Sequence, residues 1–514
     1  MQVFIESVFK GRYQLYVATL AWVSILYVLS VLVGRSIWID EGMLLKNIVN
    51  SDRWWQYMDP LPFYDQAQPM VASLLQHVFI QNISKSIDSI RLYTLLLSVF
   101  IASPFLYVLY KERAGFSLPS LVFLAFSFSL GFYLTEIKHY SFEIAASFFM
   151  ISIFYLNMKG EMRFELATVS IGAAICFGFS TLIPAFVLIS YLTALQINEY
   201  GRDFFSGRNL ASLFLVFVIA LISFLHMDQL TVYQINNFAA YHSKGLLGDI
   251  KTLIFAGVSA HGKFLTIAVA IIVVASLFRD KRSLFFHINL VFVLIVGFIC
   301  LGKLIGVYPI ASSRHIIWLA PFSFLILVIG ILDFVKSERF LVAALGWGAL
   351  VLVLFQAGDV IYQTYNGRSP ELTENARLYQ ELATLEPSQV AVYPHAQPTL
   401  DFYLETNEQL RKHSYTGLTE YLSGPKKATT GKSRFRDRVD KSLIPLLNGV
   451  SHYVISHLDL FAPPERAVNF MSSRRSYLKA KFLEYGCSYK AIFSGHRASL
   501  LKVSCLKECL RCQN

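Results

Sequence analysis

The feature that most limits what this chain can fold into is a series of long apolar blocks, many of them near 20 residues. An α-helix needs about 20 apolar residues to cross the ~30 Å hydrocarbon core of a bilayer. Of the 514 residues, 55% are hydrophobic and only 15% are charged, whereas soluble proteins carry about 25% charged residues. The sequence therefore predicts a polytopic helical membrane protein and excludes a multidomain cytosolic enzyme, a disordered chain and a secreted disulfide-rich mini-protein.

Eleven blocks are predicted as membrane spans. The first, 15–34, is too long for the apolar core of a signal peptide, and no small-residue cleavage site follows it. A single helix over 164–197 would measure about 50 Å, and Pro184 favours a break, so we predict two spans joined by a tight turn there. The remaining spans are 90–110, 117–135, 140–158, 164–180, 182–197, 209–227, 263–278, 284–304, 315–334 and 339–358.

The distribution of basic residues predicts the orientation of these spans. With the N-terminus inside, the inside segments hold 13 Lys or Arg in 46 residues, and the outside segments before the tail hold 8 in 107. Cytoplasmic loops carry an excess of Lys and Arg. An odd number of spans then places the C-terminal tail outside. The net charge of +11 is thus interpreted as topology and lipid contact, and no nucleic-acid partner is expected.

The sequence predicts that most extramembrane mass lies on the outer side. The apolar stretch 69–83 is short for a span and is interrupted by Gln76, His77 and Gln81, which is typical of an interfacial helix lying on the membrane. We expect a transmembrane domain, 1–358, whose outer loop 35–89 carries interfacial helices, and a small extracytoplasmic α/β domain, 359–514. The tail has β-like runs at 389–393, 453–456, 491–494 and 499–503, and helical stretches at 370–384 and 463–485.

A basic stretch lies within this tail. Residues 424–441 contain seven Lys or Arg and two Asp. A solvated, charged loop explains this composition, and contact with anionic lipid headgroups is the functional alternative.

The sharpest local motif is Ser-Ile-Trp-Ile-Asp-Glu-Gly at 36–42. Asp40 follows the first span so closely that it lies at most about 20 Å beyond it, and Trp38 suits the headgroup layer. The carboxylates of Asp40 and Glu41 could accept a proton from a hydroxyl group or bind a cation. The alternative is that both residues simply begin a helix, where negative charge is favourable.

Several short motifs, in this order along the chain, resemble those of the GT-C glycosyltransferases. The protein mannosyltransferase type (glycosyltransferase family 39-like), which includes the bacterial enzyme that adds aminoarabinose to lipid A, is the most similar. The resemblance covers roughly 1–340, and it departs from the family at Gln68-Pro69-Met70, where many relatives have His-Pro-Pro. The matching motifs are Trp38-x-Asp40-Glu41, Tyr64-Asp65-x-x-Gln68-Pro69, Ser89-Ile90-Arg91-Leu92-Tyr93, Glu136-Ile137-Lys138-His139-Tyr140-Ser141, and Tyr308-Pro309 followed by Arg314-His315 and Pro321.

The resemblance implies an inverting enzyme that transfers a hexosyl or pentosyl group from a polyprenyl-phosphate-linked donor at the outer membrane face. The acceptor would be a lipid, a glycan or a protein, and we expect a bacterial inner membrane. Asp40 is the expected general base, with Glu41 beside it in the catalytic motif. Arg314 and Lys138 would hold the donor phosphate, although both could instead be snorkelling residues at span ends. No cofactor is certain, and a divalent metal is left open.

Five further residues are expected to line the cavity: Asp65, Glu136, His139, Tyr140 and Tyr308. If a helix begins before Glu136, then Glu136, His139, Tyr140 and Glu143 share one helical face. For Glu143 alone we expect a polar helix end. A non-enzymatic flippase or export component for lipid-linked glycans is the alternative function, but the spans lack the mid-membrane charges of a polar transport path. A receptor or scaffold would leave the Asp-Glu pair without a role.

Four cysteines near the C-terminus suggest a disulfide in an oxidising compartment. We expect Cys487 to pair with one of Cys505, Cys509 and Cys512, while a four-thiolate zinc site and a frayed terminus with free thiols are the alternatives. The other two cysteines, Cys176 and Cys300, lie in apolar blocks, where a free thiol behaves as a small hydrophobic group.

Overall fold

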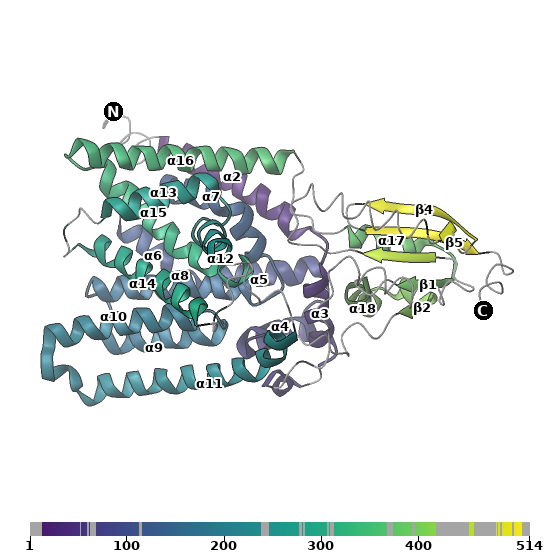
Figure 1. Cartoon of the computed structure of the whole chain (residues 1–514), viewed down its shortest axis with the longest axis horizontal. Helices are drawn as coiled ribbons and strands as arrows, with labels where there is room; N and C mark the ends of the chain where they lie inside the picture. The colour runs from purple at the N-terminus through teal and green to yellow at the C-terminus, as the bar shows by residue number, and fades with distance from the viewer. Residues whose placement is uncertain are drawn as a thin grey trace.

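The computed structural model describes residues 13–51, 53–58, 61, 68–112, 116–237, 246–276, 280, 283–305, 308, 313–366, 374–392, 396–417, 452–456, 480, 482–483, 486–495 and 498–505. In the described residues as far as Tyr365 the regular elements are all helices, and a five-stranded sheet with flanking helices follows. Figure 1 shows the helices gathered in a bundle and the sheet beyond one end of it. The predicted fold, a polytopic all-α membrane bundle with a small C-terminal α/β unit, is confirmed.

The helical elements of the bundle are named as in Figure 1. They are α2 (Tyr13–Val33), α3 (Ile39–Val49), η2 (Trp54–Met58), α4 (Met70–Asn82), α5 (Ile87–Ile101), α6 (Pro104–Lys111), α7 (Ser117–Leu134), α8 (Tyr140–Met158), α9 (Phe164–Ala174), η3 (Ile175–Phe177), α10 (Leu182–Tyr200), η4 (Gly201–Phe205), α11 (Gly207–Asn237), α12 (Leu246–Thr252), the π-helix η6 (Leu253–Val258), α13 (Lys263–Ser276), α14 (Leu284–Leu304), η7 (Ser313–His315), η8 (Ile317–Leu319), α15 (Ala320–Val335) and α16 (Phe340–Tyr365).

The eleven predicted spans are helical, but the helices fall into three classes. Eight helices among the described residues are long and apolar enough to cross a bilayer. Two bent pairs pass the same test together: α5 with α6, bent by 47°, and 248–258 with α13, bent by 90°. The helix Phe164–Phe177 is apolar but short, about 21 Å at 1.5 Å per residue. The bend before α6 coincides with Pro104, which has no N–H to continue the preceding helix.

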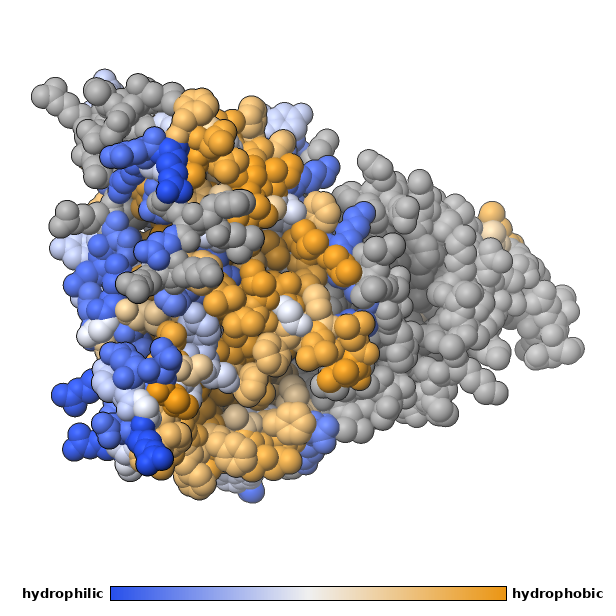
Figure 2. Space-filling view, turned by 60° about the vertical axis from the view of Figure 1, so that its left-hand side comes forward, coloured by the Kyte–Doolittle hydropathy of each residue, from blue (hydrophilic) through white to orange (hydrophobic). Residues whose placement is uncertain are grey.

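The centre of the bundle is formed by α8 and α15. Of their most apolar windows, 83% and 89% of residues are buried, compared with 11% for α11 at the edge. Phe324 of α15 packs in edge-to-face contact with Phe105 and Phe148. Figure 2 shows an apolar belt across the visible face of the bundle, with hydrophilic residues gathered on the left-hand side of this view. Lipid is as apolar as this belt, so such a surface suits a bilayer.

The structure adds helix to the connections between the spans and corrects one expectation about them. In the stretch 228–262, α11 continues to Asn237 and α12 and η6 occupy Leu246–Val258. The helix α8 begins at Tyr140, with His139 as its N-cap, so Glu136 does not share a helical face with Glu143. Glu136 and Lys138 lie instead in the short connection between α7 and α8.

The C-terminal unit is an α/β sheet packed with helices. It comprises α17 (Asn375–Thr384), β1 (Gln389–Val392), α18 (Gln397–Thr406), η10 (Glu408–Lys412), β2 (Ser414–Gly417), β3 (His452–Ser456), β4 (Cys487–Gly495) and β5 (Ala498–Cys505). The strand order is β2-β1-β3-β5-β4. The central strand pair β1–β3 is parallel, whereas β5 is antiparallel to β3 and β4. All four predicted strands are present, but β2 and α18 were not predicted.

The cysteine prediction is confirmed for Cys487, which is disulfide-bonded at the start of β4. The backbone of Cys505 lies opposite it in the ladder between β4 and β5, while the side chain of Cys505 and the whole of Cys509 and Cys512 lie outside the described residues. Cys176 and Cys300 are free thiols, as predicted. The basic stretch 424–441 and most of the predicted helix 463–485 also lie outside the described part.

Candidate active site

The helix α3 carries the Asp-Glu motif immediately after the first span. Its N-cap is Trp38, in an extended conformation, and the backbone N–H of Trp38 donates a 3.2 Å hydrogen bond to Oε2 of Glu41. Asp40 and Glu41 occupy the first turn, where carboxylates are stabilised by the helix dipole. Asp40 and Glu41 therefore begin a helix, as the alternative interpretation of the motif expected. This placement also fixes where the two carboxylates point.

Glu41 is fully buried at the junction of three segments. Its carboxylate accepts hydrogen bonds from Nη2 of Arg91 at 2.7 Å, Nη2 of Arg35 at 3.4 Å and the backbone N–H of Ile137 at 3.0 Å. Burial alone would raise the pKa of Glu41, but the charges of Arg91 and Arg35 and these hydrogen bonds hold it below its ordinary value. Removing one partner of such a buried pair is strongly destabilising, so the geometry gives Glu41 a structural role.

Asp40 points in another direction, toward two cations from distant parts of the chain. Its Oδ2 lies 3.5 Å from Nζ of Lys138 and accepts a hydrogen bond from Nη1 of Arg314. Burial opposes ionisation, but the charges of Lys138 and Arg314 keep the pKa of Asp40 below its ordinary value. The three side chains are between 6% and 18% exposed. The cluster therefore carries two positive charges against one negative charge at the edge of the bundle.

Glu136 lies two residues before Lys138 and is fully buried. Neither of its carboxylate oxygens has a hydrogen-bond partner among the described residues. Burial, and then the nearby charge of Glu41, raise the pKa of Glu136 to about 8. Glu136 is thus mostly protonated at neutral pH, unlike Asp40 and Glu41.

A second polar layer lies beside this cluster, where α8 begins. The His139 ring contacts the ring of Tyr140, at 4.3 Å between centroids, and Nε2 of His139 is 3.9 Å from Oε1 of Glu143. The same Oε1 accepts a 3.0 Å hydrogen bond from the backbone N–H of Ser180. Burial, and then the charge of Lys138, hold the pKa of His139 well below its ordinary value, so this imidazole is neutral.

Tyr308 connects this layer to the segment that bears Arg314. Its hydroxyl group donates to the backbone carbonyl of His315, and Nε1 of Trp318 donates to the Tyr308 oxygen at 3.1 Å. The rings of Tyr140 and His315 are perpendicular, with centroids 6.3 Å apart. All predicted site residues except Asp65 therefore lie in one region, where each contacts another site residue or a residue next to one. Asp65 lies outside the described residues.

No three His, Cys, Asp or Glu side chains within the described part of the chain are arranged to hold a metal ion. The oxygen of Asp40 that faces the cluster is already occupied by two cations. The divalent metal left open by the sequence thus has no candidate ligand set in these residues.

Comparison with solved structures identifies the fold. The crystal structure of ArnT from Cupriavidus metallidurans bound to undecaprenyl phosphate is similar over 97% of this chain and 98% of that chain, with a TM-score of 0.50 and 12% identity. The chain has the GT-C fold of ArnT. The apo structure of the same protein matches over 95% and 97%, with a TM-score of 0.48 and 13% identity. No family model and no curated protein matches the sequence.

Within this GT-C fold, sequence reasoning missed the partners of the predicted residues. Arg35 directly follows the first span and is easily interpreted as a snorkelling anchor, yet its guanidinium packs on the Phe132 ring at 3.9 Å and bonds Glu41. Arg91 has no predicted role beyond its place in a motif. The signal that could have found it is that Arg91 is the single basic residue of α5 and is followed by a largely apolar stretch, because a buried charge there requires a partner.

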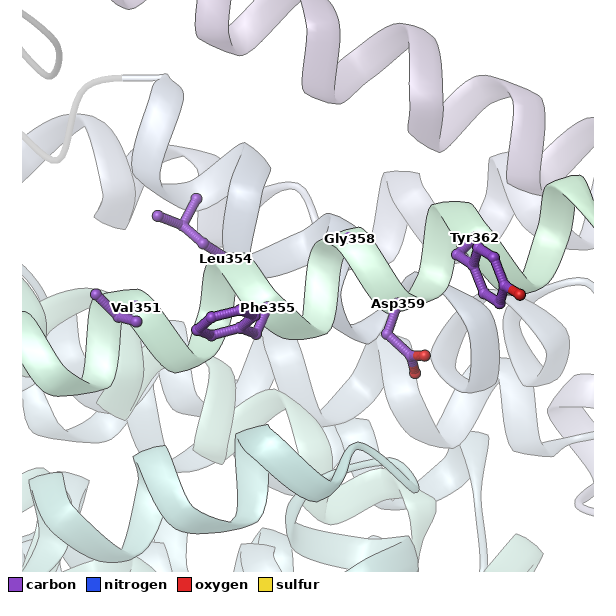
Figure 3. Close-up of a pocket in the computed structure, with 6 residues that line it drawn as sticks. All are labelled: Val351, Leu354, Phe355, Gly358, Asp359 and Tyr362. Carbon is purple, nitrogen blue, oxygen red and sulfur yellow. The ribbon is translucent and has the colours of Figure 1, made fainter.

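A groove of about 530 Å³ lies elsewhere, along one face of α16 (Figure 3). Six residues of this one helix line it: Val351, Leu354, Phe355, Gly358, Asp359 and Tyr362. Its single carboxylate, Asp359, accepts a 2.6 Å hydrogen bond from Gln363 one turn later. The groove shares no residue with the predicted site, so the Asp40 cluster remains the candidate active site.

Proposed function

We propose that the protein is a membrane glycosyltransferase that uses a polyprenyl-phosphate-linked sugar as donor, at the outer face of the membrane. The observation that carries this proposal is the contact of one carboxylate, Asp40, with two cations, Lys138 and Arg314, at the ends of apolar helices. The likeness to an ArnT structure that contains undecaprenyl phosphate supports a lipid phosphate as the partner of these cations.

Arg314 and Lys138 would bind the donor phosphate. A phosphate at the membrane surface forms short, charge-assisted hydrogen bonds with Arg and Lys. The same cations would stabilise the negative charge that develops on the phosphate as the bond to the sugar breaks, because they are fixed and largely shielded from water. In the structure, the Asp40 carboxylate contacts both cations. It therefore occupies a position at which a negative charge is stabilised.

Asp40 would be the general base. The acceptor hydroxyl or amine attacks the anomeric carbon on the side opposite the phosphate, the bond between carbon and phosphate oxygen breaks, and Asp40 takes the acceptor proton. The two cations hold the pKa of Asp40 low in the resting protein. A donor phosphate that shares these cations would weaken that effect and raise the basicity of Asp40 at the moment when a base is needed.

The remaining predicted residues would shape the cavity. Glu136, His139, Tyr140 and Tyr308 are proposed to line it, and Asp65 stays a predicted lining residue. Glu41 would support Asp40 through its fixed position in α3. We further propose an N-terminus in the cytoplasm, a transmembrane domain 1–358, an extracytoplasmic domain 359–514 and a bacterial inner-membrane location.

The experiment that tests this function incubates purified protein with a panel of polyprenyl-phosphate sugars and candidate acceptors. We expect release of polyprenyl phosphate with at least one donor, and its loss in Asp40→Asn. Movement of the intact donor across proteoliposome membranes without sugar release would instead identify a flippase and contradict the proposal.

A further inference from the structure

The outer α/β unit contacts the helix that bears Asp40. We propose that this unit, through α17 and α18, is a positioning element that fixes α3 and thereby the Asp40 carboxylate. The kinetic part of this inference rests on the proposed function, whereas its structural part does not.

The first contact fixes the connection before α3. Nδ2 of Asn375, at the start of α17, donates a 3.2 Å hydrogen bond to the carbonyl of Ile37. The backbone N–H of Ala376 donates to Oγ of Ser36, also at 3.2 Å. Asn375, Ile37 and Ser36 are all buried, so the loss of either bond would remove a hydrogen bond from a buried polar group, which is costly. The outer unit thus holds the chain three to four residues before Asp40.

The second contact lies on α3 itself, at Gly42. A Cβ atom at this position would lie 2.9 Å from the carbonyl oxygen of Pro398 and 3.0 Å from the backbone nitrogen of Thr399. The obstacle is backbone at the start of α18 rather than a flexible side chain. The two helices can therefore approach this closely only because residue 42 is glycine.

The third contact lies one turn further along α3. Nζ of Lys46 is 3.6 Å from Oε1 of Glu405, in the last turns of α18. Residues four apart lie on the same face of a helix, so Gly42 and Lys46 share the face that α18 covers. Asp40, two positions before Gly42, lies about 200° around the helix at 100° per residue. The outer unit therefore covers the back of α3, while Lys138 and Arg314 contact the front.

Apolar packing completes this interface. Phe402 of α18 is fully buried in a cluster with Ile37, Leu44, Leu45 and Ile48. These four residues belong to α3 and its preceding connection, so the outer unit and the helix share one small hydrophobic core. A general base must be held within about 0.5 Å of its productive position, and this core with its polar contacts supplies that constraint.

The decisive variant is Gly42→Ala, compared with Gly348→Ala. Both glycines lie inside helices, but a Cβ at Gly348 meets nothing within 4 Å, so the control carries the same gain in helix propensity without the collision. Hydrogen exchange of the 39–49 peptide should be about fivefold faster in Gly42→Ala than in wild type. We expect kcat to fall about tenfold while the donor KM stays within twofold, because Arg314 and Lys138 are untouched. The Gly348→Ala protein should match wild type in all three measurements.

A charge-reversal pair guards against a Gly42→Ala protein that does not fold. Lys46→Glu and Glu405→Lys each place like charges together, and each should speed exchange of the 39–49 peptide about two- to fivefold, as expected for a partly exposed pair. The double variant restores opposite charges between positions 46 and 405 and should recover part of the protection; the recovery is partial because Arg411, 3.9 Å from Glu405, meets a like charge at position 405. Wild-type exchange in Gly42→Ala, or a double variant no better protected than the single variants, would overturn the inference.

The two readouts separate this inference from the proposed function. If wild-type protein transfers no sugar from any donor in the panel, the proposed function fails, but the exchange experiment still decides whether α18 fixes α3. If transfer occurs and kcat is unaffected in a Gly42→Ala protein with accelerated exchange, the positioning role fails and the glycosyltransferase proposal stands.

Discussion

Asp40 and Glu41 are adjacent in sequence, yet their environments differ. Glu41 receives hydrogen bonds from two arginines and two backbone N–H groups and is fully buried. Asp40 is partly exposed and faces Lys138 and Arg314. The Asp-Glu motif therefore combines one carboxylate that is enclosed in the packing with one that faces two cations at the edge of the bundle, and the first predictions concern this difference.

Asp40→Asn should retain the fold and lose most sugar transfer. The amide keeps the shape of the side chain but cannot accept the acceptor proton, and loss of a positioned base costs on the order of 10² to 10⁴ in rate. The rate of polyprenyl phosphate release at pH 7 measures this. Asp359→Asn, in the α16 groove, is the matched control and should transfer normally; full activity in Asp40→Asn would remove Asp40 from the mechanism.

Arg314→Ala should weaken donor binding or slow phosphate departure, by about 10- to 100-fold in kcat/KM. The reason is the loss of the guanidinium that contacts Asp40 at the proposed phosphate position. Steady-state kinetics with the donor varied provide the measurement, and Arg377→Ala, whose side chain is 71% exposed, is the control. Unchanged kcat and KM would leave Arg314 as a membrane anchor only.

Glu136 predicts a pH dependence of stability. Its pKa of about 8 in the folded protein lies above the ordinary 4.5, so the folded state binds one more proton than the unfolded state between these values. Stability should then fall as pH rises from about 4.5 to 8 and change no further above that range. Thermal unfolding in detergent at pH 5 and pH 8 tests this. The melting temperature of Glu136→Gln should fall less between these two pH values than that of the wild type. The exposed Glu381→Gln should leave the fall unchanged, and an equal fall in Glu136→Gln would contradict the protonated state.

At the level of elements, the close approach between α8 and the segment after η3 depends on one glycine. A Cβ on Gly178 would collide with Cγ of Glu143, and the carboxylate of Glu143 accepts a hydrogen bond from the backbone N–H of Ser180. Gly178 has an extended backbone, with φ of −163°, a conformation that any residue can adopt. Glycine is therefore required here because a larger side chain has no space, not because of the backbone conformation. The packing of the short helix Phe164–Phe177 against α8 therefore depends on residue 178 being glycine.

Gly178→Ala should lower the melting temperature of the protein, because overpacking typically costs about 1–3 kcal/mol. Adding Glu143→Ala removes the obstructing side chain, so the double variant should be less destabilised than the sum of the two single variants. Thermal unfolding of the four proteins measures this coupling. Gly297→Ala, where a Cβ meets nothing within 4 Å, serves as the control, and strict additivity would exclude the contact.

Elements were predicted well where one local property decides them. Hydropathy located the spanning helices of the bundle, and short β-like runs located β1, β3, β4 and β5. The strand β2 has only four residues, Ser414–Gly417, which is too short for a pattern to be distinguished. The sequence indicated candidate site residues one at a time, but not the contacts between them. Asp40 and Arg314 are separated by 274 positions, and no local pattern predicts that they meet. Likewise, no local pattern predicts that Arg91, rather than solvent, stabilises the charge of Glu41.

For the whole molecule, the charge asymmetry predicts which end of the bundle faces the cytoplasm. On a cysteine-free background, Cys introduced at the exposed Lys490 should react with an impermeant maleimide added outside, and Cys at Glu161 should react only after permeabilisation. The prediction rests on an odd number of crossings. External labelling at position 161 would reverse the orientation and move the Asp40 cluster to the cytoplasmic face.

The short helix Phe164–Phe177 has a consequence for the surrounding lipid. At about 21 Å it is about 9 Å shorter than a typical hydrocarbon core. It is followed by a non-helical segment, in which the backbone N–H of Ser180 donates a hydrogen bond to Glu143. Irregular backbone at membrane depth is stable only where protein or water covers it. Protein covers this segment, because Ser180 and Thr181 are both buried. The helix is nevertheless shorter than a typical bilayer core, so we expect the surrounding bilayer to thin locally, at a modest cost in free energy. Vesicles of different acyl-chain length should accordingly alter the turnover rate, and thin bilayers, which match this short helix best, should give the fastest turnover.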